Sequence, residues 1–267
     1  MKSNDHKVIL TFLIVLIPVY LLFLSGCRKN DSLVDFPVAL TLELREVFLN
    51  DARHTALFVS TVQEYECINY EIEFQYTQTT QHRHIAFTGI YVPSTCATAI
   101  GPATAYILLG EMDADRHDVL FDIDKDLLKT AFDVDDSSIH VVVEEGETEL
   151  LDFVEYTMKR LPEDYVWGYI IARSSENQNS FDDFFDKLWN TGALPQDLPP
   201  GNYGFFRITE DKEMILFSYD VSYYPDHFFI CTTDNDFYQL QAVAESFSEH
   251  YVIVLFSARG DYYHNQL

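Results

Sequence analysis

Residues 68–76 read Ile68-Asn69-Tyr70-Glu71-Ile72-Glu73-Phe74-Gln75-Tyr76, an unbroken alternation of apolar and polar side chains. Successive side chains of a β-strand point to opposite faces, so this period of two predicts a strand with one buried and one solvated face. The same period recurs at Leu40, Leu42 and Leu44, and again at Ile139, Val141 and Val143.

Shorter β-rich runs lie between these strands at residues 55–61, 85–92, 105–109, 119–124 and 130–134, and turn-forming clusters separate several of them. Seven or eight short strands at this spacing predict an all-β sandwich over residues 37–143. The pattern resembles immunoglobulin-like sandwiches in architecture alone. No tryptophan precedes Trp167, so the buried tryptophan of that family is absent and no residue roles are transferred.

The second half, residues 162–267, alternates between strand and helix patterns. Strands are expected at 165–172, 203–208, 214–219, 227–232 and 251–257. One helix is expected to begin at an N-cap Ser180 and to end before Gly192, and another to be capped by Asp234 or Asp236. These elements predict an α+β domain with an antiparallel sheet and two helices. Residues 144–161 are expected to form a connector helix that ends at Leu161-Pro162 and marks the domain boundary.

The charge balance narrows the range of partners. The chain has 17 basic and 43 acidic residues, a formal net charge of −26. A surface this negative repels phosphate backbones, so nucleic acid is not an expected partner. The sequence also contains no P-loop, no Gly-x-Ser-x-Gly and no Ser-x-x-Lys, and it therefore predicts neither a cofactor nor a nucleophilic enzyme.

Two groups of residues have the spacing of metal ligands. His82 and His84 share one face of a predicted strand, but no third histidine or cysteine lies near them in sequence. Asp122, Asp124 and Asp126 alternate as in a calcium loop, yet Leu127 and Asp133 stand where an EF-hand has glycine and glutamate. We therefore predict no metal site, and weak calcium binding by the acidic clusters stays open.

The cysteines divide into three kinds. Cys67 and Cys96 both lie in the first half and are the expected disulfide pair if the protein occupies an oxidising compartment. Cys231 lies in the apolar run His227-Phe228-Phe229-Ile230-Cys231 and is expected to be a buried, unreactive thiol. The remaining cysteine, Cys27, follows the apolar segment at the start of the chain.

That segment has the order of a secretory signal. Lys2 and Lys7 precede an uncharged run from Val8 to Leu24, which closes on Leu24-Ser25-Gly26-Cys27. The last four residues resemble the lipobox of bacterial lipoproteins. The resemblance implies a signal peptide at residues 1–26, acyl chains such as palmitate on Cys27, and a tether at 27–36. An uncleaved transmembrane helix is the alternative, although 17 apolar residues are near the lower limit for a span.

Aromatic residues are concentrated in the second half, where 23 of the 106 residues from 162 onward are Phe, Tyr or Trp. Adjacent rings on a strand cannot both point into one core, so some are expected at a surface. The candidate binding surface comprises Tyr223, Tyr224, Phe228, Tyr262 and Tyr263.

Together these features predict a cell-envelope lipoprotein that acts as a non-enzymatic binding or accessory module at the membrane surface. The expected partners are the membrane, through the lipid anchor, and an envelope protein or a glycan. A glycan-binding protein and an envelope hydrolase with a carboxylate pair are the alternatives. Arg28 follows the lipobox cysteine in place of an inner-membrane retention aspartate, which favours the outer membrane.

Overall fold

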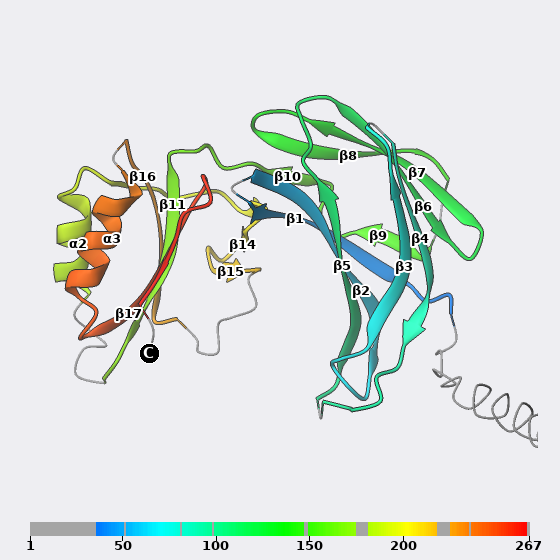
Figure 1. The fold of residues 1–267 in the computed structure, drawn as a ribbon, viewed down its shortest axis with the longest axis horizontal. Helices are drawn as coiled ribbons and strands as arrows, with labels where there is room; N and C mark the ends of the chain where they lie inside the picture. The colour runs from blue at the N-terminus through cyan, green and yellow to red at the C-terminus, as the bar shows by residue number, and fades with distance from the viewer. Residues whose placement is uncertain are drawn as a thin grey trace, which may run out of the picture. The chain divides into compact units, whose positions relative to one another are not determined.

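Strands dominate the structure, a computed structural model that describes residues 36–50, 52–80, 82–97, 99–146, 149–174, 181–217, 225–234 and 236–265. Within these residues the strands form one sheet of thirteen and one of five, and two helices accompany the smaller sheet (Figure 1). The expectation of a β-rich first half and a second antiparallel sheet with two helices is confirmed at this level.

The large sheet has the strand order β15-β14-β13-β10-β8-β7-β6-β4-β3-β5-β2-β1-β9. Eight of its strands come from the first half: β1 (Leu40–Leu49), β2 (Ala52–Tyr65), β3 (Glu71–Gln78), β4 (His82–Tyr91), β5 (Gly101–Gly110), β6 (Arg116–Ile123), β7 (Asp126–Val134) and β8 (Ser138–Glu145). The others are β9 (Leu151–Phe153), β10 (Thr157–Lys159), β13 (Gly201–Asn202), β14 (Phe206–Ile208) and β15 (Met214–Leu216).

The large sheet curls around a single core. Strands β9 and β10 follow each other in the chain, yet β9 pairs with β1 and β10 pairs with β8, which lie far apart in the strand order. The segment 151–159 therefore bridges two distant parts of the sheet, and the curvature is visible in Figure 1. Inward side chains of successive strands fill the enclosed space with one apolar cluster, which includes Leu42, Leu57, Phe121, Phe132 and Phe153.

The small sheet has helices on one face only. Its order is β12 (Leu194–Pro195), β16 (His227–Thr232), β11 (Tyr165–Ala172), β17 (Tyr251–Ser257) and β18 (Tyr262–His264), and every pairing is antiparallel. The helices α2 (Asp182–Trp189) and α3 (Phe237–Ser246) pack on one face through a shared apolar cluster (Figure 1). Trp167, Ile230 and Phe228 point to the other face, where they join a third cluster with Phe206 and Ile208 of the large sheet.

Local signals set the ends of the helices. The carboxylate of Asp236 accepts a hydrogen bond from the backbone N–H of Tyr238, which confirms Asp236 as the cap of α3. Gly192 lies just beyond α2 with a φ of 95°, a conformation that glycine adopts at little cost. Ser180, the expected cap of α2, lies outside the described residues, and Phe181 occupies the N-cap position.

Two expectations about the chain beyond residue 143 were wrong. The described part of residues 144–161 contains strands β9 and β10 instead of a connector helix, because Leu151 and Phe153 alternate with Asp152 and pair with the edge of β1. The hairpin of β14 and β15 forms as expected but does not join the small sheet. It extends the large sheet through β13, which pairs with β10.

The expected disulfide is present. Cys67 and Cys96 are bonded, with their Cα atoms 5.4 Å apart, within the range that a disulfide spans. The bond ties the start of the loop after β2 to the loop before β5. Cys231 is fully buried, and burial raises the pKa of its thiol to about 12, as expected for an unreactive cysteine.

Residues 34–267 group as one compact unit, which contains the three apolar clusters described above. The boundary expected near residues 144–161 stays a prediction. None of the helices in the described part of the chain combines the length and apolar character needed to cross a membrane. The signal segment and Cys27 lie outside the described residues.

Candidate functional site

A hollow of about 880 Å³ lies where the outer side of the large sheet approaches the helix-free face of the small sheet. Its large-sheet wall carries the rings of Phe48, Phe58, Phe74 and Tyr106, from β1, β2, β3 and β5. Its small-sheet wall carries Trp167, Phe256 and Tyr262, and Phe205 and Phe217 flank the β14–β15 hairpin between them. Concave sites lined largely by aromatic rings are typical ligand-binding sites.

The rings form a continuous row from the protein interior to the surface. Phe48 stacks on Phe205 with centroids 5.2 Å apart, and Phe205 lies 4.8 Å from Trp167. Trp167 stacks on Phe256 at 5.9 Å, and Phe256 lies 5.2 Å from Tyr262. Trp167 is buried, whereas 57% of Tyr262 is exposed, so the row extends from the buried Trp167 to a ring that solvent can reach.

The inner wall of the hollow already holds one cation between aromatic rings. The guanidinium carbon of Arg45 lies 3.9 Å from the ring centroid of Phe58 and 4.5 Å from that of Phe217. Its Nη2 atom is 2.6 Å from the carboxylate of Glu43, which also pairs with Arg207. Arg45 and Glu43 are both buried, so the positive charge is neutralised within the protein.

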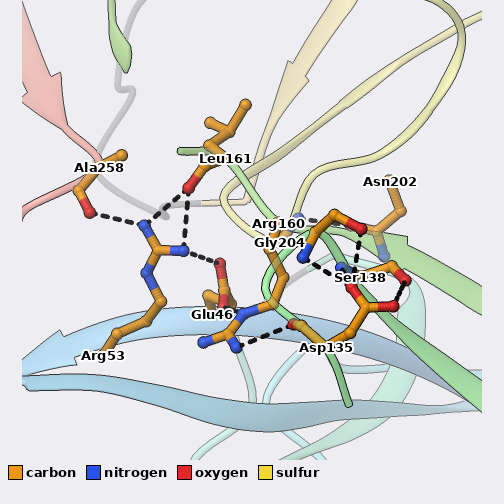
Figure 2. Close-up of polar contacts among 10 residues, drawn as sticks. Glu46, Arg53, Asp135, Ser138, Arg160, Leu161, Asn202, Gly204 and Ala258 are labelled. Atoms are coloured by element: carbon orange, nitrogen blue, oxygen red, sulfur yellow. Dashed lines mark hydrogen bonds and ion pairs between the residues drawn. The ribbon is translucent and has the colours of Figure 1, made fainter. Parts of the chain in front are cut away.

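A buried polar cluster behind the hollow joins the two sheets (Figure 2). Arg160 donates through Nε to Glu46 at 2.9 Å, and Arg53 lies 3.6 Å from the second carboxylate oxygen. Arg53 also donates to the carbonyl oxygens of Leu161 and Ala258, the latter at 2.6 Å. Because Ala258 follows β17, this arginine of β2 connects the large sheet directly to the small one.

Burial is the largest influence on the pKa values of Glu46 and Arg53 in this cluster. Glu46 is enclosed, and loss of hydration raises the pKa of its carboxyl above the ordinary value of 4.5, although Arg53 and Arg160 act in the opposite direction. Burial likewise lowers the pKa of Arg53. Gly204 covers the carboxylate: its backbone approaches so closely that a Cβ there would lie 2.9 Å from Cγ of Glu46. The cluster is therefore a support for the hollow and not a surface that a ligand meets.

The structure separates the residues of the expected aromatic surface. Tyr262 is exposed and lines the hollow. Tyr263, its neighbour on β18, packs partly against the helix-side cluster, and Phe228 packs against the cluster on the opposite face of the sheet. Tyr223 and Tyr224 lie outside the described residues. Of the three described members, one reaches the hollow.

The histidine and aspartate groups have structural partners. His82 pairs with Asp118 of the neighbouring strand at 3.0 Å. Asp122 accepts a hydrogen bond from the backbone N–H of Lys125 in the tight turn between β6 and β7, where Asp124 and Lys125 both have positive φ. In the described part of the chain, no group of three or more His, Cys, Asp or Glu side chains is arranged to hold a metal ion.

Sequence reasoning missed the large-sheet wall of the hollow. Phe58 of β2 points outward between its buried neighbours Leu57 and Val59. Tyr106 of β5 points outward between its buried neighbours Ala105 and Ile107. They face each other across β2 and β5 in register. A large ring at an outward position of a strand was the available signal, and two such rings on paired strands would have strengthened it.

In comparisons with known proteins, no protein-family model, no curated protein and no solved structure matches the chain.

Proposed function

We propose that this protein is a lipid-anchored, non-enzymatic binding module of the cell envelope, and that the aromatic hollow is its ligand site. The observation that carries the proposal is the row of rings from buried Trp167 to exposed Tyr262 along a hollow of about 880 Å³. Apolar surface of this kind stays exposed in a folded protein mainly where something binds.

The anchor is inferred from the signal segment and the lipobox cysteine, Cys27. Acyl chains on Cys27 would hold the folded body at the membrane surface, since two or more chains give stable anchoring. The disulfide between Cys67 and Cys96 supports an oxidising compartment such as the envelope. The outer membrane is preferred over the inner membrane because Arg28 follows the cysteine.

An envelope protein and a glycan are the two candidate partners. Half-exposed rings such as Phe74 and Tyr106 favour either, because amphipathic rings pack against sugar faces as well as against peptide side chains. The immunoglobulin-like sandwich also stays a proposal for residues 37–143, supported by eight strands around one apolar cluster. Nucleic acid remains an unexpected partner at a net charge of −26.

The anchor is tested by replacing Cys27 with serine. The wild-type chain is expected to partition into the detergent phase and to carry acyl chains on Cys27 in mass spectra. The Cys27→Ser chain is expected in the aqueous phase or as an uncleaved precursor. A wild-type chain with an unmodified Cys27 would rule out the anchor without affecting the binding site.

The hollow is tested by capture of envelope components on the immobilised full chain. Tyr106→Ala and Tyr262→Ala remove exposed rings from opposite walls and are expected to abolish retention of whatever the wild type retains. Tyr238→Ala on α3 is the matched control, since Tyr238 is exposed to 67% and lies on the helix side. Equal retention by all four chains would show that the hollow is not the binding site.

A further inference from the structure

Besides buried Glu46, two carboxylates line the hollow, those of Glu71 and Asp261. Glu71 of β3 is exposed, whereas Asp261, just before β18, is half-buried and accepts a hydrogen bond from the hydroxyl of Ser257 at 2.7 Å. The other charged lining residues, Arg45 and Glu46, are buried and paired within the protein. A ligand that enters the hollow therefore meets carboxylates and rings. A negatively charged ligand would be repelled by Glu71 and Asp261 and by the net charge of −26.

The acidic character continues beyond the first hollow. A second hollow of about 530 Å³ shares Glu71, Ile72 and Phe74 with the first and has Glu73 on its border. The two hollows share one stretch of β3, and acidic side chains recur along it. Such a surface complements an extended chain with several positive charges.

Arg45 shows how these walls hold a cation. Its guanidinium lies between the rings of Phe58 and Phe217, at 3.9 and 4.5 Å, and pairs with the carboxylate of Glu43. Glu71 pairs with Thr104, two residues before the exposed Tyr106 on β5, and Asp261 directly precedes the exposed Tyr262. All four of these acidic and tyrosine residues line the hollow. Rings with a nearby carboxylate attract a guanidinium or an ammonium group through the ring quadrupole and through charge.

We propose that the hollow binds a basic, extended segment of a partner protein, with an arginine or lysine side chain against the exposed tyrosines and near Glu71 and Asp261. This inference rests on the proposed function, because it names the partner class of the same site. A neutral glycan could stack on the rings, but the carboxylates would not attract it by long-range electrostatics, because it has no net charge.

The test uses the full chain in a non-ionic detergent and a short peptide of alternating glycine and arginine. Trp167 lines the hollow, so its fluorescence reports occupancy when the second tryptophan is removed by Trp189→Phe. We expect saturable binding that weakens with added salt. Tyr262→Ala and Glu71→Gln are each expected to weaken binding by about tenfold, the range that one cation–π or ionic contact supplies.

Glu249→Gln is the matched control for charge, because Glu249 is exposed beyond α3 and the change alters the net charge as Glu71→Gln does. Tyr238→Ala is the control for loss of an exposed ring. Both are expected to bind the peptide as the wild type does. Thermal unfolding of every variant checks that the fold is retained.

Two outcomes would overturn the inference. Equal weakening by Glu71→Gln and Glu249→Gln would mean that net charge alone attracts the peptide. The absence of peptide binding would exclude a basic partner. If the peptide does not bind but a neutral oligosaccharide does, and Tyr262→Ala abolishes that binding, the proposed function stands. The proposed function fails separately, if the hollow variants retain envelope components as the wild type does.

Discussion

Replacing Glu46 with alanine is expected to lower the free energy of unfolding by about 1–3 kcal/mol, the cost of leaving a buried hydrogen-bond donor without its acceptor. Arg160 would lose the acceptor that lies 2.9 Å from its Nε atom, and Arg53 would lose the carboxylate 3.6 Å away. The Nε–H group of Arg160, whose side chain is 15% exposed, would then have lost this acceptor inside the protein. Denaturant unfolding of the full chain measures the loss.

The neutral variant Glu46→Gln separates charge from hydrogen bonding. Because burial raises the pKa of Glu46, the folded protein binds a proton more tightly than the unfolded chain does. Ionisation of Glu46 therefore costs stability as the pH rises from the unfolded value of 4.5 through the raised pKa, and the effect is complete above it. Relative to Glu46→Gln, the wild type is expected to lose stability over this window.

The opposite slope would contradict this account. If the wild type gained stability over Glu46→Gln as the pH rose, Arg53 and Arg160 would outweigh burial and the pKa would be lowered. Denaturant unfolding of the wild type and Glu46→Gln at a series of pH values from 4.5 upward measures the slope. Glu46→Ala should be less stable than Glu46→Gln throughout, since alanine also removes the acceptor of Arg160.

Several strands could be predicted to the residue because their signals are local. The expected strands at 165–172, 227–232 and 251–257 coincide with β11, β16 and β17. Each is an apolar run with many β-branched or aromatic residues, bounded by polar or turn-forming residues. The Asp236 cap was predictable for the same reason, since capping depends on a few consecutive residues.

The errors arose where distant pairing decides the structure. Residues 148–158 carry apolar residues at spacings that also suit a helix, but the open edges of β1 and β8 offered hydrogen bonds that only strands could satisfy. The β14–β15 hairpin was located correctly, yet nothing in its own residues states which sheet it joins. Long-range pairings of this kind override local preference.

The candidate site was predictable in part for a similar reason. Tyr262 was selected because adjacent rings on a strand cannot share a face, and its position on the hollow follows from that rule. Tyr263 and Phe228 were selected by the same rule, but each packs partly against an apolar cluster. The sequence does not show which elements form these clusters. Phe58 and Tyr106 come from strands distant in sequence and meet the others only through the arrangement of two sheets.

Gly168→Ala is expected to lower the free energy of unfolding by about 3 kcal/mol or more, near the upper end for overpacking a core. Gly168 lies in β11, the strand between β16 and β17. A Cβ atom there would lie 2.1 Å from the carbonyl oxygen of Val254, and a backbone atom of a paired strand cannot move aside as a flexible side chain can. Glycine at this position permits close approach of the neighbouring strand.

Gly101→Ala is the matched control, because it adds the same methyl group to a strand of the large sheet. Gly101 is buried, and its Cβ atom would lie 2.9 Å from Cγ2 of Ile68, a methyl group that a χ1 rotation can move because the side chain is exposed to 51%. We expect a loss of about 1 kcal/mol, the lower end for overpacking, since the neighbouring atom can give way. Equal unfolding midpoints for the two variants would mean that β11 and β17 do not approach as closely as the structure describes. A large loss of stability in Gly168→Ala alone would instead show that β11 and β17 are closely packed. These two strands belong to the sheet that carries Trp167 and Tyr262, the small-sheet wall of the hollow.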